Sequence, residues 1–284
     1  MRETPWLPYF LLLPATAFLI AFFLMPFIEV ALAAFTTKGG DAFVLDNFRT
    51  MASDWKFVPA VRNTFVLTLI IVPLQTVLAL ALANLVMQIR RGADIVLYIL
   101  TIPLGISDLA AGLIWLAILD QTGYLNSALY GLGLISGPQN ILSYQNIPVL
   151  FLAVILAEVW RATAIMLVIL VAGMGLIPRE YYEAAEVFGA GAWKRFVRIT
   201  LPLLKPSLQT ALILRTILAF EVFAIVAALA GTNLQVLMGE TYAWQFDFQD
   251  TGVASAYAML ILAISIAFTL LFLWTLRDRT GART

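Results

Sequence analysis

Cysteine and histidine are both absent from this sequence of 284 residues. Without cysteine there are no disulfides and no thiol chemistry, and without histidine the commonest metal ligand and proton shuttle is missing. No Walker A phosphate-binding pattern occurs, so the chain has no recognisable nucleotide site. These absences argue against an enzyme, and they predict that the chain itself binds no metal and no cofactor.

Charge is also scarce, because only 12% of the residues are charged while 62% are hydrophobic. Soluble domains contain about 25% charged and 45–50% apolar residues. The 17 basic and 17 acidic residues balance, so bulk electrostatics indicates neither nucleic acid nor an acidic partner. The composition predicts a protein that crosses a membrane several times.

Long apolar runs are what the sequence has in abundance, and a spanning helix needs about 20 such residues. The first run can be misread as a signal peptide, but it is longer than the 7–15 apolar residues typical of one. No repeat or linker divides the chain, so we expect residues 1–284 to form one all-α membrane domain. The six predicted spans are Pro8–Phe35, Val61–Met87, Ile95–Leu119, Ile147–Ile177, Pro206–Ala230 and Val253–Leu276.

The basic residues predict the orientation of the spans, since Lys and Arg concentrate on the cytoplasmic side. One side of the membrane carries most of them, whereas the connections Asp120–Asn146 and Gly231–Gly252 on the other side contain none. We therefore expect both termini to be cytoplasmic. The residues assigned to the cytoplasm are Arg2, Arg90, Arg91, Arg179, Lys194, Arg195, Arg198, Lys205, Arg277, Arg279 and Arg283, and those assigned outside are Lys38, Arg49, Lys56 and Arg62.

The most charged segment, Glu180–Pro206, lies on the cytoplasmic side between the fourth and fifth spans. It is predicted to form two short helices, Arg179–Phe188 and Ala192–Arg198, separated at Gly189 and Gly191 because glycine tolerates left-handed backbone. An interfacial helix on lipid headgroups explains the basic residues. It does not explain the glutamates of the first helix, so docking to a second protein is favoured.

The spacing within this segment resembles the EAA loop of binding-protein-dependent ABC importers. Glu183, Ala184 and Ala185 are followed after three residues by Gly189, after nine more by Ile199, and then by Leu201 and Pro202. The resemblance implies a coupling helix that sits in a cleft of a cytoplasmic ATPase. It also implies a second permease subunit, two ATPase subunits that bind ATP and Mg, and an extracytoplasmic solute-binding protein, all at a prokaryotic cell membrane.

Other segments resemble the carbohydrate-uptake members of this family, of the maltose and glycerol-phosphate permease type. They include Arg62-Asn63-Thr64, the loop motif Gly123-Tyr124-Leu125-Asn126 and the start of the sixth span, Gly252–Ala256. Ala230-Gly231-Thr232-Asn233 departs from the Thr-Gly-Gly-Pro that is usual after the fifth span. The resemblance therefore implies a sugar or polyol importer, and it leaves open a permease for another solute.

Charged residues within the spans are Asp108, Glu158, Arg161, Arg215 and Glu221. Such charges are costly in a bilayer, so they either pair to hold helices together or line a polar solute path. The depths of the fourth and fifth spans predict the pairs Arg161–Glu221 or Glu158–Arg215.

Several polar and aromatic residues carry two interpretations. Trp115 and Trp160 can stack on a sugar ring or face lipid and protein. Gln75 and Asn84 can line a path or hydrogen-bond between helices. The aromatic run Tyr242–Phe248 is an interfacial belt or a contact for an external binding protein.

Two other classes of protein remain as alternatives. A stand-alone secondary carrier or channel is compatible with charges in the spans, but it leaves the EAA-like segment without a role. An intramembrane enzyme is disfavoured, because no paired catalytic motif accompanies the missing cysteine and histidine.

Overall fold

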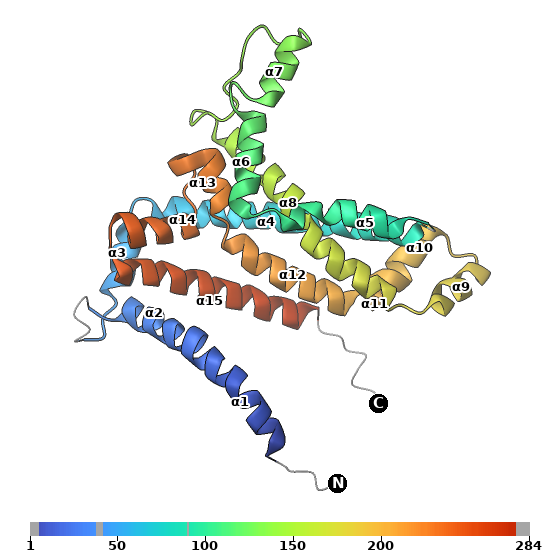
Figure 1. Cartoon of the computed structure of the whole chain (residues 1–284), viewed down its shortest axis with the longest axis horizontal. Coiled ribbons are helices and arrows are strands. Elements are labelled where there is room, and N and C mark those ends of the chain that lie inside the picture. The colour runs from blue at the N-terminus through green and yellow to red at the C-terminus, as the bar shows by residue number, and fades with distance from the viewer. Residues whose placement is uncertain (1–5, 38–41, 90, 277–284) are drawn as a thin grey trace. The chain divides into compact units, whose positions relative to one another are not determined.

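The computed structural model describes residues 6–37, 42–89 and 91–276, and their regular structure is helical (Figure 1). Of the charges used to orient the chain, Arg2, Lys38, Arg90, Arg277, Arg279 and Arg283 lie outside the described residues. The α-helices are α1 (Leu7–Leu19), α2 (Met25–Phe35), α3 (Asp46–Ser53), α4 (Phe57–Gln88), α5 (Ala93–Thr101), α6 (Asp108–Leu119), α7 (Tyr124–Gly131), α8 (Ile147–Gly175), α9 (Arg179–Val187), α10 (Ala192–Arg195), α11 (Leu201–Leu203), α12 (Lys205–Phe220), α13 (Ala224–Ala230), α14 (Leu237–Tyr242) and α15 (Thr251–Thr275).

Within the described residues, four helical stretches are long and apolar enough to cross a membrane. They are Tyr9–Phe35, Phe57–Gln88, Ile147–Gly175 and Thr251–Thr275. These agree with the first, second, fourth and sixth predicted spans to within a few residues. The number rises to six if each of two sharply bent helix pairs is counted as one span.

The third predicted span, Ile95–Leu119, is not one straight helix, which corrects the expectation. A 3-10 turn over Ile102–Gly105 ends α5, and the stretch beginning at Asp108 is bent by 96° from it. Pro103 lies in this turn and has no N–H to continue a helix. Ser107 then starts α6, because its Oγ accepts a hydrogen bond of 3.2 Å from the N–H of Ala110. Asp108 is thus the first residue of a helix rather than the middle of one.

The fifth predicted span, Pro206–Ala230, is also interrupted. Helix α12 ends at Phe220, and a new helix, α13, begins at Ala224. Phe223 before it has φ −145° and ψ −59°, which is not helical. Hydropathy counts apolar residues but does not register such a break. Glu221 is the charged residue at this interruption. It follows the last residue of α12 and is exposed.

The chain divides into two compact units, Met1–Val58 with Glu240–Leu262 and Pro59–Gly239 with Ala263–Thr284. In the second unit α8 packs against α12 and α6 packs against α13. Gly173 makes the first contact possible, since a Cβ there would lie 2.6 Å from the Cβ of Ser207 and 2.9 Å from Leu204 Cδ1. Small residues at such crossings let helix backbones approach closely in membranes.

In the first unit, Asn47 joins α3 to the end of α2. Its side-chain amide donates hydrogen bonds of 3.0–3.1 Å to the carbonyls of Ala33, Ala34 and Thr36, at the end of α2. These carbonyls have no partner inside the helix, so Asn47 acts as a cap supplied from α3. Gly252 lies beside it, where a Cβ would approach the Asn47 side chain to 2.8 Å.

Candidate functional site

Three polar side chains from three helices meet in the second unit, and all are almost fully buried. Arg215 of α12, Glu158 of α8 and Gln75 of α4 are 1%, 2% and 0% exposed. Arg215 donates from Nη2 to Glu158 Oε2 at 2.6 Å and from Nε to Gln75 Oε1 at 2.5 Å. Gln75 in turn donates to the backbone carbonyl of Glu158 at 2.9 Å. The expected Glu158–Arg215 pair is confirmed, and Gln75 bonds between helices.

Arg161 extends this network toward a more open position. Its Nη1 lies 2.9 Å from Asp108 Oδ1, and its Nη2 lies 3.7 Å from Glu158 Oε1. The Arg161 side chain is 11% exposed, whereas that of Asp108 is 50% exposed. The alternative pair Arg161–Glu221 is wrong, because the bend before α6 brings Asp108 to this arginine instead. The positive charges of two guanidinium groups thus balance the negative charges of two carboxylates in this network.

The two tryptophans of the fourth and third predicted spans lie close to each other. The ring centroids of Trp115 and Trp160 are 6.3 Å apart with the planes at 71°, an edge-to-face arrangement. Trp160 is 38% exposed and sits next to Arg161 in α8. Helices α6 and α8 thus carry both an aromatic pair and a partly open ion pair, which suits a solute with hydroxyl groups and an apolar ring face.

The EAA-like segment begins with α9, which ends at Val187, and Gly189 follows as the predicted break. Gly189 has φ +71°, and its N–H donates to the carbonyl of Glu186 at 2.9 Å. The N–H of Ala190 donates to the carbonyl of Ala185, also at 2.9 Å. These two bonds form a Schellman motif, which needs a left-handed residue in this position. Glu183 and Ala184 are exposed on α9.

The second half of the segment differs from the short helix that was expected. The helical stretch continues from α10 through a π-helical turn, Phe196–Thr200, into α11, so that Ile199, Leu201 and Pro202 belong to it. An ion pair between Arg195 and Glu186 links this stretch to α9. Tyr182 and Thr200 form a second link through their hydroxyls, 3.1 Å apart.

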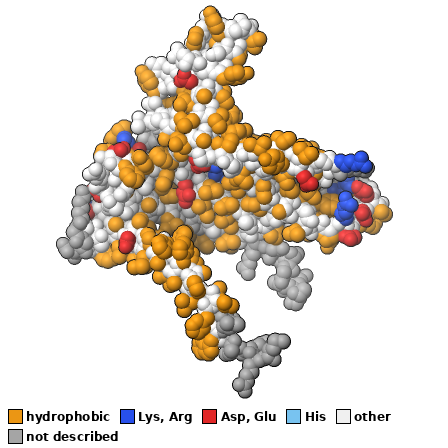
Figure 2. All heavy atoms as spheres, in the orientation of Figure 1, with side chains coloured by type: hydrophobic (Ala, Val, Ile, Leu, Met, Phe, Trp, Pro, Cys, Tyr) orange, Lys and Arg blue, Asp and Glu red, His pale blue; other side chains and the backbone are white. Residues whose placement is uncertain are grey.

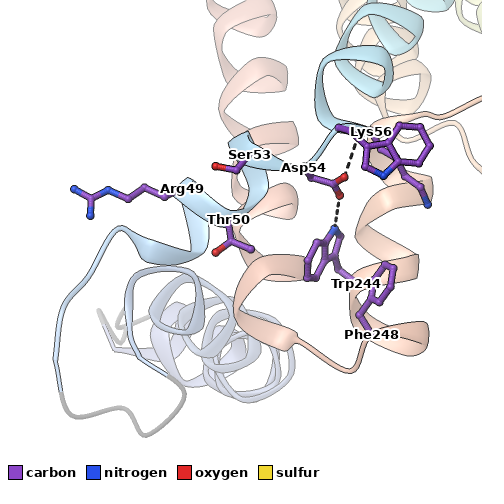
Figure 3. A pocket seen from close by; sticks show the side chains of 8 residues that line it. Arg49, Thr50, Ser53, Asp54, Lys56, Trp244 and Phe248 are labelled. Carbon is purple, nitrogen blue, oxygen red and sulfur yellow. Dashed lines mark hydrogen bonds between the residues drawn. The ribbon is translucent and has the colours of Figure 1, made fainter.

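A separate pocket of about 530 Å³ lies in the first unit (Figure 3). Trp244 Nε1 donates to Asp54 Oδ2 at 3.2 Å, while the side chain of Arg49 points away from these residues. Lys56 Nζ lies 3.9 Å from Glu240 Oε2, yet burial raises the pKa of the Glu240 carboxyl above its usual value. The aromatic run is helical here, with ring contacts between Tyr242 and Phe246 and between Trp244 and Phe248.

Comparison with known proteins places these features in a family. Residues 75–279 match the model for binding-protein-dependent transport system inner membrane components. The trehalose/maltose transport system permease of Thermococcus litoralis is 32% identical over 238 residues, which cover 81% of this chain and 78% of that protein. The sulfoquinovosyl glycerol transport system permease of Agrobacterium fabrum is 34% identical over 242 residues, 82% of this chain and 76% of that protein.

A solved structure shows the same fold. A chain of a bacterial alginate ABC transporter, determined in complex with an alginate pentasaccharide-bound periplasmic protein, aligns with a TM-score of 0.83. The two chains are 22% identical, and the alignment covers 96% of this chain and 94% of the other. Taken with the family match, these findings establish that the chain belongs to the binding-protein-dependent transport system inner membrane components, and that it is a membrane transport permease rather than an enzyme.

Proposed function

We propose that the chain is one of two permease subunits of an ATP-driven importer for a sugar or related polyol. The named relatives transport trehalose, maltose or a sulfoquinovosyl glycerol, and the structural neighbour imports alginate. The solute differs among them, so only the chemical class is carried over to this chain. A departure from the family pattern, Ala230–Asn233, forms the end of α13 and a 3-10 turn in which Gly231 has φ +55°.

The proposed topology has six spans with both termini in the cytoplasm. The EAA-like segment then faces the cytoplasm, together with most of the basic residues. Charged side chains of both signs gather around α9 and α10, beside largely apolar surface (Figure 2). We treat the two compact units as parts of one permease domain spanning residues 1–284.

Coupling to ATP hydrolysis is assigned to α9, and the geometry of this helix is the observation that carries the proposal. Glu183 is exposed on α9, and Val187 and Phe188 at its C-terminal end are 85% and 86% exposed. Two adjacent apolar side chains this exposed at a helix end are consistent with a surface that a partner covers. We assign that partner as a cytoplasmic ATPase, which binds ATP and Mg and receives the motif residues Glu183, Ala184, Ala185, Gly189, Ile199, Leu201 and Pro202.

The solute path is assigned to the more open part of the charged network. Asp108, Arg161 and Trp160 are partly exposed and present both polar and aromatic groups. Arg215 and Glu158 are buried and hydrogen-bonded to each other, so we assign them the role of holding α8 against α12. Trp115 supports Trp160, and Glu221 stands apart at the end of α12. Six spans supply half of a path, and a second permease subunit supplies the other half.

Reconstitution tests this proposal directly. Proteoliposomes with the chain, its second permease, the ATPase and the binding protein should take up solute only with ATP inside. A thermal-shift screen of the purified binding protein against sugars and polyol phosphates identifies the solute. Uptake by the chain alone without ATP would instead identify a secondary carrier, and a binding protein that responds to neither class would remove the carbohydrate assignment.

A further inference from the structure

A large cavity lies beside the EAA-like segment and has no role in the function proposed above. It measures about 1020 Å³ and is lined by the final turns of α4, the end of α8, helix α9 and the stretch from α10 to Thr200, all in the second unit. The α4 wall is mostly apolar, with Val77, Leu80 and Leu85, although Asn84 and Gln88 of α4 also line the cavity; Met174 of α8 adds to the apolar lining. The volume is slightly above the range of about 300–1,000 Å³ typical of ligand pockets.

Part of the remaining lining is basic or aromatic with a polar group. Arg179 and Arg195 both border the cavity, and so do Tyr182 and Trp193. Guanidinium groups bind phosphate oxygens in a bidentate manner. Trp and Tyr are enriched where a protein meets the boundary between membrane and water, and Trp193 is 76% exposed. The lining therefore fits a molecule that is anionic at one end and apolar along the rest.

The position of the cavity indicates which molecule this is. Helices α4 and α8 are long enough to cross the membrane, and they end at Gln88 and Gly175. Their ends lie at a bilayer surface whichever way the chain is oriented. Basic pockets between membrane helices bind the head groups of anionic lipids. We propose that this cavity binds an anionic phospholipid, with the phosphate at Arg179 and Arg195 and an acyl chain along the α4 wall.

A lipid in this position would act on the coupling segment. Arg195 also pairs with Glu186 of α9, so the phosphate and the α9 carboxylate share one guanidinium. The bound lipid braces α10 against the ends of two spans. Transport should therefore depend on the anionic lipid content of the membrane, independently of which solute is carried.

The test uses the assembled transporter in nanodiscs that contain phosphatidylcholine and phosphatidylglycerol, with retained lipid measured by native mass spectrometry after detergent extraction. The wild type should retain phosphatidylglycerol in preference to phosphatidylcholine. Each near-surface arginine contributes about fivefold to such binding, so Arg179→Gln with Arg195→Gln should lower retention by roughly 25-fold. Inorganic phosphate should not displace the lipid, because it cannot occupy the apolar wall.

Two control variants isolate the cavity from its surroundings. Arg198→Gln removes a basic residue of the same helical stretch that does not line the cavity, and Glu186→Gln removes the ion pair alone. Both should retain phosphatidylglycerol. Equal retention of the two lipids, unchanged retention in the double variant or displacement by inorganic phosphate would overturn the proposal. So would efficient cross-linking of Asn84→Cys, the only cysteine in that variant, to another subunit, since it would show that protein fills the cavity.

Discussion

Arg215 of α12 and Glu158 of α8 form a buried charge-assisted hydrogen bond of 2.6 Å, and each is at most 2% exposed. Removing one member leaves the other charge buried without a partner, which is disfavoured by about 3–5 kcal/mol. Glu158→Gln or Arg215→Met should therefore lower the unfolding temperature and the yield of the complex. Glu221→Gln is the control, because Glu221 is exposed. Unchanged thermal unfolding of both single variants in detergent would show that the pair does not hold the helices.

Substitutions in the Arg161–Asp108 pair should reduce solute transport more than they reduce assembly of the complex. Arg161 is 2.9 Å from an aspartate whose side chain is 50% exposed, so its loss leaves less charge buried than the loss of Arg215. Arg161→Ala and Asp108→Asn are each expected to reduce uptake at least about tenfold, which corresponds to about 1.4 kcal/mol. Complex yield should stay within about twofold of the wild type by the same reasoning on burial. If size-exclusion chromatography shows that the yield of the complex falls as much as uptake does, the pair is structural.

A substitution at Gly189 tests the effect of backbone conformation alone, because an added side chain would not crowd any neighbour. It has φ +71°, and a Cβ placed there would meet nothing within 4 Å. Gly189→Val should thus cost about 1–2 kcal/mol from the left-handed backbone alone, and it should weaken retention of the ATPase during purification. Gly191→Val is the matched control, since Gly191 also has open space but φ −64°. Equal ATPase retention in the two variants would contradict this account.

Gly173 and Gly175 form a second matched pair, in this case for packing. A Cβ on Gly173 would collide with Ser207 of α12, whereas one on Gly175 would meet nothing within 4 Å. Gly173→Ala should destabilise the α8–α12 contact by about 1–3 kcal/mol, as overpacking does in close-packed interiors. Gly175→Ala should be nearly neutral. The unfolding temperatures of the two variants test this. An unchanged unfolding temperature for Gly173→Ala would show that α8 and α12 can move apart at little cost.

Local signals in the sequence predicted local structure well. The break at Gly189 followed from glycine chemistry, and four of the spans followed from long apolar runs. The interruptions around Pro103 and Phe223 were missed, because a proline, a capping Ser107 or a non-helical residue changes direction without lowering hydropathy. Hydropathy gives the depth of a residue but not its rotation about the helix axis.

That limit explains which contacts could be predicted. Depth alone allowed Arg161 to pair with Glu221, and only the bend before α6 reveals Asp108 as its partner. The role of Gln75 was left open for the same reason, since one sequence does not show which face of α4 meets Arg215. Gly173 carried a usable signal, namely a small residue in an apolar span, that was not interpreted.

Charge reversal at Glu183 is the sharpest test of whether α9 couples this permease to an ATPase. ATP-driven uptake by proteoliposomes is measured for Glu183→Lys and for Glu180→Lys, which makes the same change at an exposed residue of the same helix outside the motif. We expect Glu183→Lys to abolish ATP-driven uptake while the binding protein still binds solute, and Glu180→Lys to retain uptake. Normal ATP-driven uptake in Glu183→Lys would contradict the coupling role of α9.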